Sequence, residues 1–172
     1  QAEAIYFQST GKLAAYNCSF KSYQDTIQVG NKGGKAWFYK CYIEGDVDYI
    51  WGTADVALFE ECKFKTLNDD NRKTKTSDLL VARTYKQGSK IAKGFVVFNS
   101  EIEIENGMTQ TFGRCAGSGS DFWDQGAAIN TKITGTGTLD PAFWQAKNYN
   151  PMKDHETFVG WKDYNITNAN DQ

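Results

Sequence analysis

Two aspartates that hold the same position in neighbouring sequence repeats are the residues best suited to chemistry. Asp25 lies in SYQDTI and Asp48 in GDVDYIWG, and each follows a cysteine, Cys18 or Cys41, by seven residues. If the repeats stack, equal offsets place both carboxylates on one face of neighbouring coils. Two nearby carboxylates push their pKa values apart, leaving one protonated acid and one ionised nucleophile or base. Taken singly, each aspartate fits an ordinary turn or surface acid; the matched offset favours chemistry.

Few other residues offer a competing reaction type. Arg114 in FGRC and Arg83 in VART are the candidate cations that would favour an ionised carboxylate. The single histidine, His155, lies in the polar segment KDHETF and reads as a solvated surface residue, which argues against a Ser-His-Asp or Cys-His arrangement. The cysteines form no Cys-x-x-Cys pair, so we expect neither a zinc site nor any other cofactor.

The composition is that of an acidic protein rich in aromatic residues, and it excludes two classes of partner. The 172 residues fit a single domain. The net charge is −2 and the isoelectric point is about 5.4, so no basic field favours nucleic acid. No window reaches the roughly 18 apolar residues that span a bilayer, so we expect no membrane partner.

The sequence carries weak signs of a secreted protein. The segments NCS at Asn17 and NIT at Asn165 are glycosylation sequons. The four cysteines are compatible with disulfides and equally with buried free thiols. No signal peptide is recognised. Secretion would therefore require that this chain begin after processing or be a piece of a longer protein.

Short strand-like runs recur along the chain and resemble one another, each with a small residue before an apolar one. The first three small residues are cysteines spaced by 23 and 21 residues, and the later gaps are 38 and 31. A strand-based period of 20 to 25 residues predicts a parallel β-helix, in which equivalent positions form ladders about 4.8 Å apart. Cys18 and Cys41 would then be neighbours, either bonded as a disulfide or packed as a thiol ladder. The aligned runs are YNCSF (16–20), YKCYI (39–43), EECKF (60–64), FNSEI (98–102) and INTKI (129–133).

The longer gaps and the tail depart from this repeat. The polar segment 65–78 is predicted to be a surface excursion, and segment 113–126 a glycine- and serine-rich loop. In that loop Trp123 either contacts a ligand or packs the loop onto the coils. We expect one domain over residues 1–172, with regular coils to about 135 and a tail over 136–172. The tail should cover the end or one side of the solenoid, with short helices allowed and these aromatic anchors: Phe143, Trp144 and Trp161.

The segments YQDT and GDVDYIWG resemble the signature segments of pectin methylesterases, carbohydrate esterases with a right-handed parallel β-helix. The family shows Gly-Tyr-Gln-Asp-Thr-Leu and, about twenty residues later, Gly-x-Val-Asp-Phe-Ile-Phe-Gly. In this chain Asp25 and Asp48 are 23 residues apart, and the opening QAEAIYF and YNCSF also look like family segments. The resemblance implies an all-β right-handed parallel β-helix that acts on methyl-esterified homogalacturonan without a metal.

The resemblance also implies catalytic roles, position by position. Asp48 matches the nucleophile that attacks the methyl ester carbonyl, and Asp25 matches the general acid and base. Gln24 matches a residue that stabilises the oxyanion. Arg114 matches the arginine that positions the nucleophile and keeps it ionised. A carboxylate nucleophile would divide the reaction into two steps through an acyl anhydride, and an amide N–H would stabilise the oxyanion.

Substrate contacts are implied at four further positions. Gln1 looks like a second oxyanion contributor, and Tyr23 and Trp51 align with aromatic positions near the substrate groove. The family has Pro-Trp after its arginine, whereas this chain has CAGSGSDFW, so Trp123 is expected to replace the displaced tryptophan. Asp46 falls at the variable second position of its motif and reads as a surface or rim acid.

Two alternatives to this function stay open at the sequence level. One is a non-catalytic β-helix that binds cell-wall polysaccharide, which the altered loop after Arg114 favours. The other is an esterase of the same mechanism on another acylated glycan. The family chain is nearly twice as long as this one, so we expect the chain to be the C-terminal part of a longer protein, with its missing N-terminal part as a partner.

Overall fold

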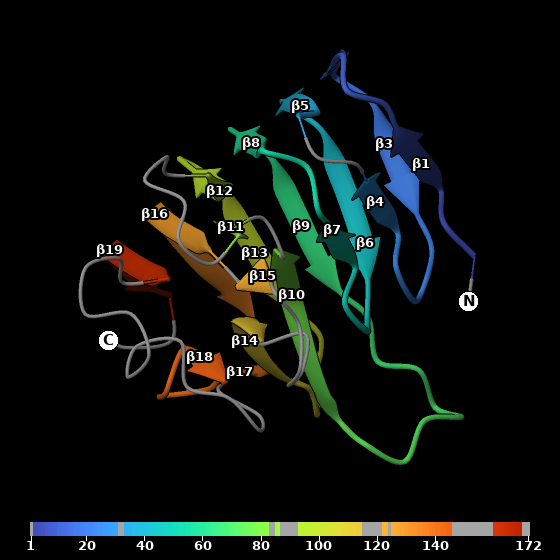
Figure 1. The fold of residues 1–172 in the computed structure, drawn as a ribbon. Helices are drawn as coiled ribbons and strands as arrows, with labels where there is room; N and C mark the ends of the chain where they lie inside the picture. The colour runs from blue at the N-terminus through green and yellow to red at the C-terminus, as the bar shows by residue number, and fades with distance from the viewer. Residues whose placement is uncertain are drawn as a thin grey trace.

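The structure is a computed structural model that describes residues 2–30, 33–82, 85–86, 93–114, 122–123, 125–145 and 160–169. Among these residues every regular element is a β-strand, and none forms a helix that could cross a membrane. The strands lie side by side from β1 at one end of the molecule to β19 at the other (Figure 1). The predicted all-β, parallel solenoid is confirmed, because nearly all the strand pairs are parallel and join successive repeats.

One sheet runs along the side of the solenoid that carries the two aspartate motifs. Its strands pair in parallel in the order β1, β4, β7, β10, β14 and β17, and β18 also pairs with β14. The register joins Ile27 to Ile50 and Ile50 to Leu80, so identical positions of successive coils lie directly above one another. The strands are β1 (Ile5–Gln8), β4 (Ile27–Gly30), β7 (Ile50–Gly52), β10 (Thr76–Ala82), β14 (Thr109–Arg114), β17 (Thr138–Leu139) and β18 (Trp144–Gln145).

A second sheet closes the solenoid and consists of two parallel ladders joined by one long strand, β16 (Gly126–Gly135). The first half of β16 pairs with β12 and the second half with β13. One ladder contains β2 (Lys12–Tyr16), β5 (Lys35–Tyr39), β8 (Val56–Glu60) and β12 (Gly94–Phe98). The other contains β3 (Ser19–Lys21), β6 (Tyr42–Gly45), β9 (Lys63–Thr66) and β13 (Glu101–Ile104).

The corner between these two ladders explains the small residues of the repeat. The residue before each small position has a φ between 49° and 54°, a left-handed conformation that turns the chain sharply. At this corner Cys62 donates a hydrogen bond from its Sγ to Phe38 O at 3.3 Å. The three cysteines in the described residues, Cys18, Cys41 and Cys62, are free thiols. The structure therefore has the thiol ladder and not the disulfide. The corner residues before small positions are Asn17, Lys40, Glu61, Asn99 and Asn130; Asn165 forms the equivalent corner before Ile166, the register partner of Thr131.

The core is a stack of inward side chains that alternate with outward ones along each strand. Phe38 and Phe59 stack with ring centroids 4.8 Å apart, and Phe64 meets Phe59 edge to face. All three rings are fully buried. Ladders of this kind hold the coils at a constant spacing, and this fixes the outward positions relative to one another.

The tail continues the solenoid further than its sequence suggests. The strand β19 (Trp161–Asn168) pairs in parallel with β16 and so adds another strand to the second sheet. The expected anchors do pack there: Trp144 and Trp161 stack with centroids 5.5 Å apart, and Phe143 contacts Phe112. The strands β11 (Tyr85–Lys86) and β15 (Phe122–Trp123) pair antiparallel and form a separate two-stranded sheet.

Candidate active site

Asp25 and Asp48 occupy equivalent positions of neighbouring coils. Each lies two residues before a strand of the first sheet, ahead of Ile27 in β4 and Ile50 in β7, and these two isoleucines are register partners. Both aspartates have positive φ, 54° and 48°, at the corner that leads into the sheet. Aspartate tolerates this left-handed conformation better than most residues. The corner turns the two carboxylates outward, and both line one cavity.

That cavity has a volume of about 300 Å³ and opens on the outer face of the first sheet. Its lining consists of two carboxylates, two amides and one indole: Asp25, Asp48, Gln24, Gln28 and Trp51. Gln28 and Trp51 are register partners on β4 and β7. Sequence reasoning missed Gln28, although its place between the apolar residues Ile27 and Val29 of β4 could have indicated an outward side chain. The cavity combines groups that can donate and accept protons with a flat apolar wall.

Arg114, at the end of β14, reaches Asp48 from 66 residues further along the chain. Its Nε donates a hydrogen bond to Asp48 Oδ1 at 2.7 Å, and its Nη2 donates to Asp48 Oδ2. This two-point contact is the strong, orienting form of an arginine–carboxylate pair. Asp48 is only 6% exposed, so a carboxylate there needs such a partner. The structure thus brings Arg114 to the residue that the sequence assigned to it.

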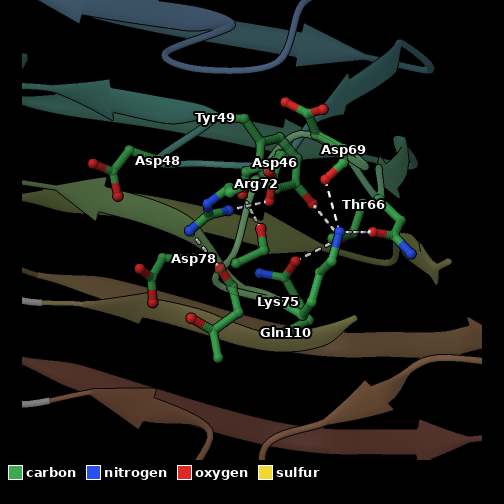
Figure 2. Close-up of polar contacts among 12 residues, drawn as sticks. Asp46, Asp48, Tyr49, Thr66, Asp69, Arg72, Lys75, Asp78 and Gln110 are labelled. Carbon is green, nitrogen blue, oxygen red and sulfur yellow. Dashed lines mark hydrogen bonds and ion pairs between the residues drawn. The ribbon is translucent and has the colours of Figure 1, made fainter. Parts of the chain in front are cut away.

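A third carboxylate, Asp78 in β10, belongs to the same cluster and was not predicted. Thr111 in β14 donates a hydrogen bond from its Oγ1 to Asp78 Oδ1 at 2.6 Å. Arg114 Nε also lies 3.4 Å from Asp78 Oδ2. Asp78 and Asp48 project in the same direction from adjacent coils (Figure 2). The repeat offset failed to find Asp78 because it follows Cys62 by sixteen residues and not seven.

The polar segment 67–75, between β9 and β10, accounts for the longer offset between Cys62 and Asp78. Asp46 anchors this segment. Asp46 was predicted to be a surface or rim acid, and this is wrong: it is only 2% exposed. Its carboxylate accepts a hydrogen bond from Arg72 Nη1, and its carbonyl accepts one from Ser77 Oγ (Figure 2). Arg72 Nη2 also donates to Thr76 O at 2.8 Å. Burial raises the pKa of Asp46, although Arg72 acts in the opposite direction.

A buried polar network lies behind the carboxylates and connects the same strands. The hydroxyl groups of Tyr49 and Thr66 are 3.2 Å apart, and Thr66 donates to Gln110 Oε1 at 2.5 Å. Gln110 in turn donates from its Nε2 to the carbonyl of Thr111. Burial raises the pKa of the fully buried Tyr49 hydroxyl, so it remains a neutral member of the network. The network holds β14 at the position from which Thr111 and Arg114 reach the site.

The remaining predicted residues fall in different places. Gln24 pairs with Val47 through an isolated β-bridge, which positions its side chain at the cavity. Tyr23 is 57% exposed and is not part of the cavity lining. The backbone of Trp123 pairs with Tyr85, and its side chain lies outside the described part of the structure. Three other residues considered from the sequence also lie outside the described ranges: Gln1, Arg83 and His155.

The described residues contain no group of three or more histidine, cysteine, aspartate or glutamate side chains that could hold a metal ion. Two carboxylates of the site, Asp48 and Asp78, contact Arg114. What this arrangement offers chemically is a nucleophile or base held by a guanidinium, a second carboxylate one coil away and an amide beside them.

Structural comparisons place this fold among known esterases. A pectin methylesterase from Erwinia chrysanthemi, PemA, superposes with a TM-score of 0.70 at 23% identity, over 100% of this chain and 54% of that one. A pectin methylesterase from carrot superposes with a TM-score of 0.67 at 19% identity, over 92% of this chain and 47% of that one. These likenesses show the fold, the parallel β-helix.

Sequence comparisons agree with the fold. "Probable pectinesterase 8" of Arabidopsis thaliana is 26% identical over 96% of this chain and 39% of its own length. "Probable pectinesterase A" of Aspergillus fumigatus is 53% identical over 30% of this chain and 15% of its own length. The chain thus spans about half the length of the solved structures, and less of the curated relatives. The sequence pattern of the family described as Pectinesterase matches residues 1–170, and the chain belongs to that family.

Proposed function

We propose that the protein containing this chain is a pectin methylesterase, which hydrolyses methyl esters of polygalacturonate to pectate and methanol. Membership of the pectinesterase family supports this proposal. The observation that carries it is the pairing of Asp25 and Asp48 in one cavity, with Arg114 bound to Asp48 and Gln24 beside them. One of the solved relatives, an aspartate-to-alanine mutant of a pectin methylesterase, is in complex with a hexasaccharide. A cavity of this kind fits one sugar of such a chain.

The proposed mechanism assigns nucleophilic attack to Asp48. Its carboxylate attacks the ester carbonyl, and Asp25 protonates the departing methoxide, which leaves as methanol. The acyl group then remains bound to Asp48 as an anhydride. Asp25, now ionised, takes a proton from a water molecule, and the hydroxide releases the galacturonate and restores the Asp48 carboxylate. In both steps an N–H of the Gln24 amide donates to the oxyanion.

The rest of the proposal concerns substrate binding and context. Trp51 and Gln28 form the described wall of the cavity and are proposed to contact the sugar ring. The proposed contacts of Gln1, Tyr23 and Trp123 stay predictions from the resemblance. Because methyl-esterified pectin is a cell-wall polymer, we also propose that the protein is secreted. The half-length match to solved relatives supports the proposal that this chain is part of a longer β-helix. That it is the C-terminal part stays a prediction from the resemblance.

Methanol release from methyl-esterified pectin by the whole protein tests this function. Asp48→Asn and Asp25→Asn should each lower the turnover rate by at least about 10³-fold, because each removes a group that forms or breaks a bond. Far-UV circular dichroism of both variants should match that of the wild type. Full activity of Asp48→Asn would refute the nucleophile assignment. Binding of pectin without methanol release would favour the non-catalytic alternative, and activity only on acetylated glycans would favour another esterase.

A further inference from the structure

The acid pair at the cavity is part of a longer ladder. Leu80 is the register partner of Ile50, just as Ile50 is the partner of Ile27. Asp78 lies two residues before Leu80, as Asp48 lies before Ile50. Asp78 is therefore the next rung after Asp25 and Asp48, about 4.8 Å from its neighbour along the ladder. The rung after Asp78 is its register partner Thr111, so the ladder of acids ends in a hydroxyl donor.

Asp78 is held as a buried, fully engaged carboxylate. Its side chain is only 10% exposed. One oxygen accepts the Thr111 hydroxyl at 2.6 Å, and the other lies 3.4 Å from Arg114 Nε. The same Nε donates to Asp48 Oδ1 at 2.7 Å, so one N–H group faces both carboxylates. A buried carboxylate loses its hydration, so its charge must be compensated by a partner. Here the partner is Arg114, the cation of the candidate active site.

We propose that Asp78 is a positioning residue for Arg114, whose guanidinium it fixes against Asp48. The inference rests on the proposed function. The two-point contact orients the guanidinium relative to Asp48, but the two side chains could still shift together. A second carboxylate on the adjacent rung fixes the position of the guanidinium, because Nε then faces acceptors from two different coils. Asp78 is not part of the described lining of the cavity and acts through Arg114.

The second consequence of Asp78 is electrostatic. Three other charged groups of the described cluster lie near Asp78: Asp25 before β4, Asp48 before β7 and Arg114 at the end of β14. A further ion pair joins Asp46 to Arg72 in segment 67–75. Asp78 therefore adds a second negative charge beside Arg114, and the Arg114 Nε–H faces both carboxylates.

Asp78→Asn tests the proposal, because asparagine keeps the shape and removes the charge. In the whole protein, kcat should fall about tenfold with KM within twofold, since the guanidinium loses one orienting acceptor. Thr111→Val removes the hydroxyl that holds Asp78, so it should also lower kcat with KM within twofold. Thr111→Ser, which keeps the hydroxyl, should restore kcat.

A measurement independent of turnover separates this inference from the proposed function. The Arg114 Nε–H group can be followed by ¹H–¹⁵N NMR and identified by its loss in Arg114→Lys. Its chemical shift should differ between Asp78→Asn and the wild type, whether or not pectin is hydrolysed, because the group loses a charged acceptor. If the wild type releases no methanol but this signal moves, the proposed function fails and the inference stands. An unchanged signal and an unchanged kcat in folded Asp78→Asn overturn the inference.

Discussion

Replacing Arg72 with methionine should destabilise the protein by an amount that depends on pH. Arg72 is the cation paired with Asp46, whose side chain is only 3% exposed. Without Arg72, an ionised Asp46 would stay buried and unpaired, which costs about 3–5 kcal/mol. Alternatively Asp46 takes up a proton, which costs about 1.4 kcal/mol for each pH unit above its unfolded pKa of about 3.9. Protonation therefore costs about 4 kcal/mol at pH 7 and about 1.5 kcal/mol at pH 5.

The folded chain takes the cheaper of these two states at each pH. Burial already raises the pKa of Asp46 in the wild type, against the opposing effect of Arg72, and Arg72→Met should raise it further. The folded variant then binds more protons than the unfolded chain between the unfolded and the folded pKa of Asp46. Its free energy of unfolding must therefore fall as the pH rises through that window and level off above the folded pKa. The loss relative to the wild type should be at most about 3–4 kcal/mol at pH 7 and at most about 1.5 kcal/mol at pH 5, because the raised pKa of Asp46 already costs the wild type part of this energy.

Urea unfolding followed by tryptophan fluorescence at pH 5 and pH 7 measures both losses, each against the wild type at the same pH. Lys75→Met is a matched control, because the Lys75 ammonium donates only within its own segment, to Asn68 Oδ1 and Asp69 O, both at 2.7 Å. Its loss should be smaller than that of Arg72→Met, because Lys75 lowers the pKa of Asp46 only through the Coulombic effect of its charge. The double variant Asp46→Asn with Arg72→Met should lose the pH dependence. Equal losses for Arg72→Met at pH 5 and pH 7 would refute the assignment of Asp46 as a buried acid that Arg72 compensates.

Two further predictions follow from the core and from a close backbone approach. In the native protein at pH 8, iodoacetamide should label the exposed Cys18 but not Cys62; burial raises the pKa of Cys62 to about 12, leaving about one thiolate in ten thousand. Peptide mapping by mass spectrometry reads out the labelling, and rapid modification of Cys62 would contradict its burial. Gly52→Ala should cost about 3 kcal/mol or prevent folding, because its Cβ would lie 1.9 Å from the carbonyl oxygen of Val29 in the adjacent strand. Gly30→Ala, whose Cβ would first meet a Tyr6 side-chain atom at 3.3 Å, should be tolerated. Thermal unfolding of both variants against the wild type measures the two effects, and a Gly52→Ala midpoint equal to that of the wild type would contradict the close approach.

Much of the fold could be predicted because short, recurring segments of the sequence determine it. The small residue after each left-handed corner recurs with the length of a coil, so the spacing of the cysteines predicted a strand-based solenoid. The same spacing placed Asp25 beside Asp48, and the register of Ile27 with Ile50 has them as neighbours. The tail was harder to predict because β19 is an end strand with an exposed outer surface, and exposure weakens the apolar alternation that marks a strand.

The sequence by itself determined the period of the coils and the two acids that share an offset within that period. Only the tertiary structure decided that Asp78 joins them. The segment 67–75 separates it from its coil in the sequence, and a ladder of backbone hydrogen bonds returns it to the same rung. The same holds for Asp46. The sequence predicts a surface or rim acid, whereas the structure buries Asp46 and pairs it with Arg72. An offset is a number of residues along the chain, whereas stacking depends on the order of the strands. An inserted segment therefore lengthens the offset without changing which strands are neighbours.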